Sequence, residues 1–218
     1  MTKEKESKRE TNRVLNLFQT PIYEEIYEGE NLDLVQEEIK SAIEETEFLE
    51  RDQSTLGHLI CKNEFNTDWI SDKKLPKFDW MLNEGLTRYC QTIGVDPDGV
   101  AYTRESWINK FEKNSFSHIH EHGQSHISGV YYYQTTGYDG NIFFETPVAQ
   151  SKCSKIWQQM PSRIYRPSCK GSVILFPGWL RHGVSENFTD DTRISISFNI
   201  NLVGDWKPLS PCERRKSN

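Results

Sequence analysis

The sequence predicts a mainly β domain of the α+β class, a jelly roll with N-terminal helices packed on one of its faces. Apolar residues recur at helical spacing in the first half of the chain and at the two-residue spacing of β-strands from about residue 100 onward. The β-like runs are short, and turn residues but no helices separate them. This arrangement is typical of an antiparallel sandwich or jelly roll and argues against a parallel βαβ sheet.

A short strand and two amphipathic helices are predicted before the β region. The strand covers residues 14–23, and its Pro21 suits a sheet edge, because proline cannot donate a hydrogen bond to a neighbouring strand. The first helix is marked by Leu32, Val35, Ile39, Ala42 and Ile43. The second helix is marked by Phe78, Met81, Leu82, Leu86, Tyr89, Cys90 and Ile93. Gly94 is expected to cap the second helix, since glycine adopts the left-handed conformation without strain.

Seven strands are expected in the second half of the chain. They cover residues 106–111, 116–122, 127–134, 141–145, 163–166, 172–176 and 192–203. In the last strand, apolar residues from Ile194 to Leu202 alternate strictly with polar residues from Arg193 to Asn201. The polar face of such a strand commonly meets water. The alternative is that the apolar face packs under the helices while Arg193 and Ser195 point into a polar barrel mouth.

The length of 218 residues suits one domain, because a domain commonly holds about 100–200 residues. We expect a disordered N-terminal segment over residues 1–13, which are polar and charged, and a flexible tail over residues 207–218. The single domain between them, residues 14–206, divides into a helical part at about 30–95 and a jelly roll at about 100–203.

Charge and cysteine content narrow the function classes. The net charge of −6 argues against a general nucleic-acid binder. Five cysteines without CxxC spacing indicate neither a disulfide framework nor a thiolate zinc site, and they fit a reducing compartment. No apolar run approaches the ~20 residues of a membrane span, and the charged N-terminus lacks the apolar stretch of a signal peptide. We therefore expect a cytoplasmic protein that does not bind membranes.

The histidines are clustered. Four of the six, His118, His120, His122 and His126, fall within nine residues. In a strand, residues two apart project from the same face, so a His-x-His pair directs two imidazoles toward one point, as a metal site requires. The segment contains this pattern twice, as His118 with His120 and as His120 with His122. The spacing alone leaves the choice between the two pairs open.

A third ligand has to come from a neighbouring strand. His182 is the only other histidine of the β region, and it follows the predicted strand at 172–176 and a Pro-Gly-Trp turn. We assign His58 and His126 to ordinary structural or surface roles, because a single histidine is more often hydrogen-bonded or exposed than a metal ligand.

The order of the motifs resembles that of a known family. The His-x-His pair is followed by SGVYY at 128–132, by Gly140 and IFFETP at 142–147, by GSVILFPGWLRH at 171–182 and by RISISFN at 193–199. This succession resembles the iron(II)/2-oxoglutarate oxygenases and is more distantly similar to the prolyl hydroxylases. The resemblance covers roughly residues 14–202, and the order of the motifs is more specific than any one of them. It implies a double-stranded β-helix, the jelly roll that these enzymes share.

The resemblance implies roles for six residues. The iron(II) ligands correspond to His120, His122 and His182. The residues that hold the co-substrate 2-oxoglutarate correspond to Arg193, Ser195 and Tyr132, with Tyr131 a weaker match for the tyrosine. Side-chain chemistry agrees, because a guanidinium binds a carboxylate through two parallel hydrogen bonds and strand alternation places Ser195 beside Arg193. The resemblance implies no catalytic side chain beyond the metal site.

The ligand set departs from the commonest pattern of these oxygenases. Most of them bind iron through His-x-Asp or His-x-Glu and a distal histidine, whereas here His122 stands at the carboxylate position. Three neutral imidazoles leave ferrous iron with its full double charge, which should tighten binding of the 2-oxoglutarate dianion. Glu145 and Glu121 are candidates for the missing carboxylate. Glu145 is favoured, because Glu121 faces away from the histidine pair in a regular strand.

The sequence therefore predicts a 2-oxoglutarate-dependent dioxygenase that uses O2 to hydroxylate an unidentified substrate, with release of succinate and CO2. The alternative is a non-catalytic jelly-roll module that binds zinc or iron, because tetrahedral zinc accepts three histidines. A lectin-like sandwich with surface histidines is a third class. Arg193 separates these hypotheses, since a plain metal-binding module has no need for a cationic carboxylate anchor. Fold does not select the substrate, and the oligomeric state stays open.

Overall fold

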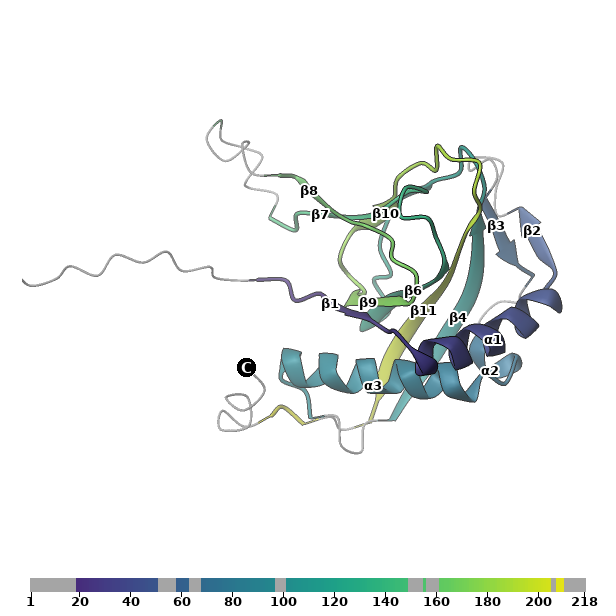
Figure 1. Cartoon of the computed structure of the whole chain (residues 1–218). Helices are drawn as coiled ribbons and strands as arrows, with labels where there is room; N and C mark the ends of the chain where they lie inside the picture. The colour runs from purple at the N-terminus through teal and green to yellow at the C-terminus, as the bar shows by residue number, and fades with distance from the viewer. Residues whose placement is uncertain are drawn as a thin grey trace, which may run out of the picture.

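The computed structural model describes residues 19–50, 58–62, 68–96, 101–148, 155, 161–204 and 207–209. Within these residues two antiparallel sheets form the layers of the molecule, and the helices lie along the larger sheet (Figure 1). The larger sheet contains, in order, β1 (Tyr23–Ile26), β9 (Ser172–Pro177), β6 (Ile127–Gln134), β11 (Arg193–Val203), β4 (Ala101–Phe111), β3 (His58–Cys61) and β2 (Phe48–Glu50). The smaller sheet contains β5 (Ser117–His120), β10 (His182–Val184), β7 (Ile142–Glu145) and β8 (Arg163–Arg166).

Consecutive strands are distributed between the two sheets, as in a double-stranded β-helix. The chain passes from β4 in the larger sheet to β5 in the smaller one, returns to β6, and crosses again to β7 and β8. Strand β9 then returns to the larger sheet, β10 joins the smaller sheet, and β11 closes the larger sheet between β4 and β6. The predicted fold class, mainly β with helices on one face, is confirmed.

Three helices pack on one face of the larger sheet: α1 (Glu30–Glu44), α2 (Trp69–Asp72) and α3 (Pro76–Ile93). Helix α3 begins at a proline, which suits the first turn because the missing N–H has no helical partner there. It ends at Gly94, whose φ of 81° confirms the predicted left-handed cap.

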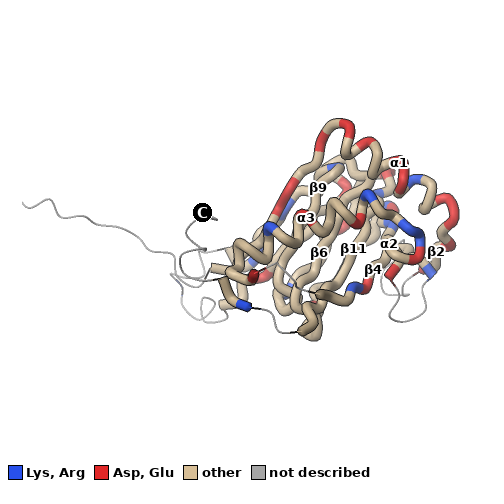
Figure 2. Tube along the Cα trace, turned by 90° about the horizontal axis from the view of Figure 1, so that it is seen from below, with Lys and Arg blue, Asp and Glu red and all other residues tan. Residues whose placement is uncertain are grey.

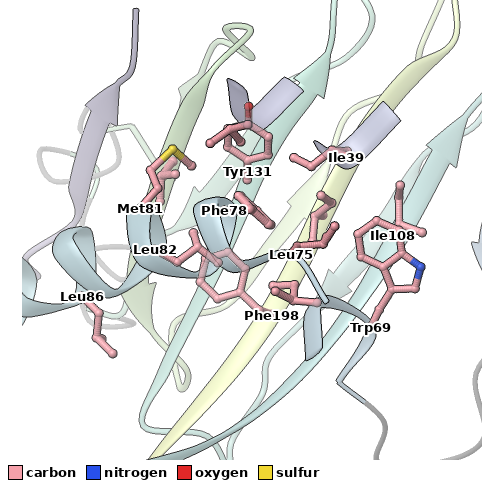
Figure 3. Close-up of a cluster of buried hydrophobic side chains, with 14 of the residues drawn as sticks. Ile39, Trp69, Leu75, Phe78, Met81, Leu82, Leu86, Ile108, Tyr131 and Phe198 are labelled. Carbon is pink, nitrogen blue, oxygen red and sulfur yellow. The ribbon is translucent and has the colours of Figure 1, made fainter. Parts of the chain in front are cut away.

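The main hydrophobic core lies between these helices and the larger sheet. Figure 3 shows Phe78 and Met81 of α3 in one cluster with Tyr131 and Phe198 of the sheet. The rings of Phe78 and Tyr131 lie 4.8 Å apart, and both side chains are fully buried. A second apolar cluster lies on the other face of the sheet and includes Val130, Tyr132, Ile142, Phe144, Ile174, Phe176 and Leu180.

Both faces of β11 are buried. Its apolar side chains Ile196 and Phe198 are 0% and 1% exposed in the core under the helices. Its polar side chains Arg193 and Ser195 are 1% and 4% exposed and line a cavity on the opposite face of the sheet. The first part of the polar face therefore does not meet water. The structure adopts the alternative arrangement, in which the apolar face packs under the helices and Arg193 and Ser195 face the cavity.

Short strands account for most differences from the sequence prediction. Strand β5 ends at His120, two residues before its predicted end, because the chain turns there. Strand β10 has only three residues, one of them Gly183, and no alternation marks it. The short β2 and β3 extend the larger sheet beyond the predicted strands. Strand β1 shares only Tyr23 with the strand predicted over 14–23 and extends to Ile26. Residues 19–22 are not in a strand, and residues 14–18 lie outside the described residues.

The chain ends bear on the predicted domain limits. Residues 1–13 and the tail from residue 210 onward lie outside the described residues. The Leu209 N–H donates to the Gly94 carbonyl at 2.9 Å, so the start of the predicted tail lies against the end of α3.

Acidic and basic residues are interspersed along the helical side of the molecule (Figure 2). Among the described helices, none is long and apolar enough to cross a lipid bilayer.

Candidate metal centre

Three histidines come together at one end of the smaller sheet. His120 is the last residue of β5 and His182 is the first of β10, and the antiparallel register places them opposite each other. His122 follows in the turn after β5. One ring nitrogen from each imidazole lies within 4.8 Å of the other two. The structure thus brings together the three residues that the resemblance singles out as metal ligands.

The turn that carries His122 is held against the segment after β9. The His122 N–H donates to the Gly178 carbonyl at 2.8 Å, and the Gly178 N–H donates to the His126 carbonyl at 3.2 Å. A Cβ atom on Gly178 would lie 2.1 Å from the Ser125 carbonyl oxygen, so only glycine permits this approach of the two chains. The FPGW motif therefore positions the turn that carries His122.

The other two histidines of the cluster lie outside this group. His118 is exposed, and its ring packs against Phe116 at 4.8 Å. His126 is exposed, and its Nδ1 accepts a hydrogen bond from the Leu202 N–H at 3.0 Å. Of the two overlapping His-x-His pairs, only the one without His118 meets the distal histidine.

Main-chain carbonyls fix the tautomer of two members of the group. The Nδ1 of His182 lies 2.8 Å from the Leu180 carbonyl oxygen, and the Nδ1 of His120 lies 2.7 Å from the His118 carbonyl oxygen. A carbonyl oxygen only accepts, so each Nδ1 carries the proton and each Nε2 keeps a lone pair. Burial, helped by the neighbouring His120, lowers the pKa of His182 to about 3. His182 is therefore neutral at physiological pH, as a metal ligand must be.

The donor set fits a divalent transition metal. Neutral imidazole is a common ligand of iron, zinc, copper and nickel. Among the described residues, no carboxylate joins the three imidazoles. Glu145, the carboxylate favoured from the sequence, instead pairs with Arg181 at 3.1 Å and Arg163 at 3.3 Å, and Glu121 is exposed. The structure therefore brings neither carboxylate to the group, which consists of three histidines.

Arg193 provides a buried positive charge that forms no ion pair in the described part of the chain, although the buried Asp139 interacts with it electrostatically. Its Nη1 donates to the carbonyl oxygens of Gly140 at 2.6 Å and Asp139 at 3.1 Å. Its guanidinium lies 4.2 Å from the centre of the Phe111 ring, and its Nε has no hydrogen-bond partner. Burial lowers the pKa of Arg193, but a guanidinium remains charged in proteins. A buried cation of this kind favours a bound carboxylate as its partner.

Arg193 and the three histidines line one cavity. Ser195 lies beside Arg193 on the same face of β11, and Tyr132 reaches the cavity from the adjacent β6. Burial raises the pKa of Tyr132 to about 12, so its phenol stays protonated and can donate a hydrogen bond. Tyr131 instead lies in the core under the helices, where its hydroxyl accepts a hydrogen bond from Gln36 at 2.7 Å. The structure thus places Tyr132, and not Tyr131, with Arg193.

The loop before β7 presents the carbonyl groups that hold Arg193. The buried carboxylate of Asp139 accepts hydrogen bonds from the Thr135 hydroxyl at 2.6 Å, the Thr136 N–H at 2.7 Å and the Ser168 hydroxyl at 3.1 Å. These bonds close the loop on itself, so the main-chain oxygens of Asp139 and Gly140 point at the guanidinium. The carboxylate of Asp139 therefore orients Arg193 through the loop.

Replacing Gly140 with alanine should destabilise the fold by about 2 kcal/mol or more, the combined scale of left-handed strain and overpacking. Gly140 has a φ of 95°, and a Cβ atom there would lie 2.4 Å from the Ser185 carbonyl oxygen and 3.0 Å from Arg193 Nη1. Urea denaturation measures the loss. Gly204→Ala is the control, because Gly204 has a φ of 89° but no atom within 4 Å of the added Cβ. Equal losses in the two variants would contradict the role of the clash.

The cavity wall also contains residues to which the sequence alone gives no role in the site. His58, expected from the sequence to have an ordinary structural or surface role, is 2% exposed, and its Nε2 lies 3.0 Å from Asn109 Oδ1. The Asn109 Nδ2 donates to the Ser197 hydroxyl at 3.1 Å. Asn199 lies farther along the same face of β11. The alternation of β11 marks its polar face, but His58 lies on a four-residue strand that shows no clear period.

Comparison with known proteins gives one family and many structures of the same fold. Residues 105–199 match the family described as "Putative 2OG-Fe(II) oxygenase". A 2OG-Fe(II) oxygenase family protein from Burkholderia pseudomallei is 12% identical, with a TM-score of 0.55, over 81% of this chain and 92% of that one. A Pseudomonas putida prolyl-4-hydroxylase is 15% identical, with a TM-score of 0.52, over 86% and 96%. HygX from Streptomyces hygroscopicus, with nickel and 2-oxoglutarate bound, is 13% identical, with a TM-score of 0.57, over 84% and 83%. No curated protein matches the sequence.

Because their identities to this chain are low, the solved structures establish only the fold. The family match rests on the sequence itself and extends from β4 into β11, so it contains all six residues that the resemblance singles out. The predicted resemblance to the 2OG-Fe(II) oxygenases is therefore confirmed over residues 105–199, together with the enzyme class and the cofactors that it implies, a 2-oxoglutarate-dependent dioxygenase with iron(II) and 2-oxoglutarate.

Proposed function

We propose that this protein uses iron(II), 2-oxoglutarate and O2 to hydroxylate a substrate, with release of succinate and CO2. In this proposal the iron ligands are His120, His122 and His182, and 2-oxoglutarate is held by Arg193, Ser195 and Tyr132. One observation carries the proposal: a buried guanidinium, which forms no ion pair among the described residues and whose Nε has no hydrogen-bond partner, lines the same cavity as the three histidines. A dicarboxylate co-substrate supplies the negative charge that this arrangement favours. Residues 14–206 would form the catalytic domain, in the cytoplasm.

The side chains of the cavity bind, orient and exclude water. Arg193 offers its unpaired Nε to a carboxylate, and the Ser195 hydroxyl and the protonated Tyr132 phenol are further donors on the same wall. Trp107 covers His122, with the two rings 6.0 Å apart, and is itself half-buried. When bound, the metal supplies the activation of O2. The protein would contribute the geometry that places the co-substrate, O2 and the substrate together.

A non-catalytic zinc module would use the same three histidines, because they suit tetrahedral zinc. It does not account for Arg193. Enclosing a cation in the protein costs several kcal/mol unless a partner offsets the loss of water. The carbonyl groups of residues 139 and 140 offset part of this cost, but a bound carboxylate would offset more. The oxygenase function therefore explains more of the cavity.

The test is stepwise reconstitution of the metal-free protein without oxygen. We expect one equivalent of Fe(II) to bind, and addition of 2-oxoglutarate to produce a visible charge-transfer band. Admission of air should then yield succinate, which is assayed directly. Binding of zinc with no band and no succinate would support the metal-binding module. Failure to bind any transition metal would remove both hypotheses.

A further inference from the structure

We propose that Asn199 sets the tautomer of His122 and that its side-chain amide reverses when a metal binds to the three histidines. The inference rests on the proposed function, because it takes these histidines as metal ligands. Asn199 lies on β11, its side chain is 6% exposed, and it lines the cavity beside His122. It would be a positioning residue, since it touches a ligand and not the metal.

Two hydrogen bonds hold the amide of Asn199. Its Nδ2 lies 3.2 Å from His122 Nδ1, and its Oδ1 accepts a hydrogen bond from the Ser128 hydroxyl at 2.8 Å. An amide nitrogen carries hydrogens and no free lone pair, so it donates and His122 Nδ1 accepts. A neutral imidazole that accepts at Nδ1 carries its proton on Nε2.

His122 therefore differs from the other two histidines. His120 and His182 direct Nδ1 at main-chain carbonyls, so the lone pair of each ring lies on Nε2, the atom that would bind a metal. In His122 the Nδ1 lone pair is used by Asn199, and Nε2 is protonated. A main-chain carbonyl can only accept, whereas a side-chain amide can exchange its donor and acceptor ends by turning through half a revolution.

Reversal of the amide keeps both of its hydrogen bonds. The Oδ1 of Asn199 would accept from His122 Nδ1–H, and Nδ2 would donate to the Ser128 hydroxyl, which serves equally as donor and acceptor. The Nε2 lone pair of His122 then becomes available. During the change Nε2 releases a proton to water and Nδ1 takes one up, so the total number of bound protons stays the same.

The tautomers can be measured by NMR on protein labelled with ¹⁵N-histidine, with Zn²⁺ as a diamagnetic probe. In the metal-free protein we expect His122 to be protonated at Nε2, and His120 and His182 at Nδ1. With one equivalent of Zn²⁺, all three should be protonated at Nδ1 and coordinated through Nε2. His122 signals are identified by their loss in His122→Gln. Protonation of His122 at Nδ1 before zinc is added, or its coordination through Nδ1, would overturn the proposal.

Two variants of Asn199 test the acceptor role. Asn199→Asp places acceptors toward both Ser128 and His122, so His122 should be protonated at Nδ1 without metal and bind Zn²⁺ at least as tightly as the wild type. Asn199→Leu removes the acceptor and should weaken Zn²⁺ binding about 10–100-fold, as loss of an outer-shell partner does. Isothermal titration calorimetry measures both affinities.

The control is Asn201→Leu, which alters the next polar residue on the same face of β11. Asn201 accepts a hydrogen bond from the His126 N–H at 3.3 Å and is not in the His122 environment, so Zn²⁺ affinity should be unchanged. Wild-type affinity in Asn199→Leu would overturn the inference alone. Absence of metal binding in the wild-type protein would overturn the proposed function as well, which separates the two failures.

Discussion

Protein in which His182 is replaced with alanine should retain no iron after anaerobic reconstitution and should form no succinate. His182 is 5% exposed, neutral and held by the Leu180 carbonyl, so its Nε2 is a fixed donor with a lone pair. Loss of a direct ligand should exceed the 10–100-fold loss of affinity that is typical when an outer partner is removed. Metal analysis and calorimetric titration with Fe(II) measure the effect.

Two other histidines serve as controls for this experiment. His118→Ala and His126→Ala should bind iron as the wild type does, because both side chains are exposed and lie outside the group of three. Circular dichroism establishes that the His182 variant is folded. Full iron binding by His182→Ala would refute the assignment. Loss of iron in His118→Ala would instead show that the first His-x-His pair binds the metal.

Arg193→Lys should weaken 2-oxoglutarate binding by about 1.5–3 kcal/mol, the scale of a charge-assisted hydrogen bond. Lysine keeps the charge but lacks the planar fork, so it cannot hold the Asp139 and Gly140 carbonyls and a carboxylate in the same geometry. Lysine is a gentler change than alanine, which would leave a cavity and two unpaired carbonyls. Titration of 2-oxoglutarate into the iron-loaded protein, followed through the charge-transfer band, gives the affinity.

The same substitution at Arg181 is the matched control. Arg181 is the residue before His182, but its side chain is exposed and pairs with Glu145. Arg181→Lys should therefore leave 2-oxoglutarate affinity unchanged, and both variants should bind iron normally. If Arg193→Lys binds 2-oxoglutarate as tightly as the wild type, another cation must anchor the co-substrate. If it loses iron, Arg193 supports the metal site rather than the co-substrate.

Elements with a long regular pattern could be predicted from the sequence. Strand β6 spans the predicted residues 127–134, and β11 begins one residue after the start of its predicted range. Helix α3 ends at Gly94 because glycine adopts the left-handed cap at little cost. Strand β10 could not be predicted, because three residues give no period. Its position is set by antiparallel pairing with β5 on one side and β7 on the other.

Site residues could be predicted from the sequence where their side-chain chemistry suits the site and their spacing places them on one face of a strand. The two-residue spacing of His120 and His122 indicated a shared direction, although His122 in fact lies beyond the end of β5 and is directed by a contact with Gly178. That contact joins segments far apart in the sequence, so no local pattern reveals it. The same reason hides His58, whose place in the cavity wall depends on the pairing of β3 with β4, because strand register is set only in the folded chain.

The position of the site residues on different sheets has a mechanical consequence. His120 and His182 belong to the smaller sheet, whereas Arg193 belongs to the larger one. A molecule that reached from the histidines to the guanidinium would connect the two sheets. Occupancy of the cavity would then oppose any change in the separation of the sheets at this site.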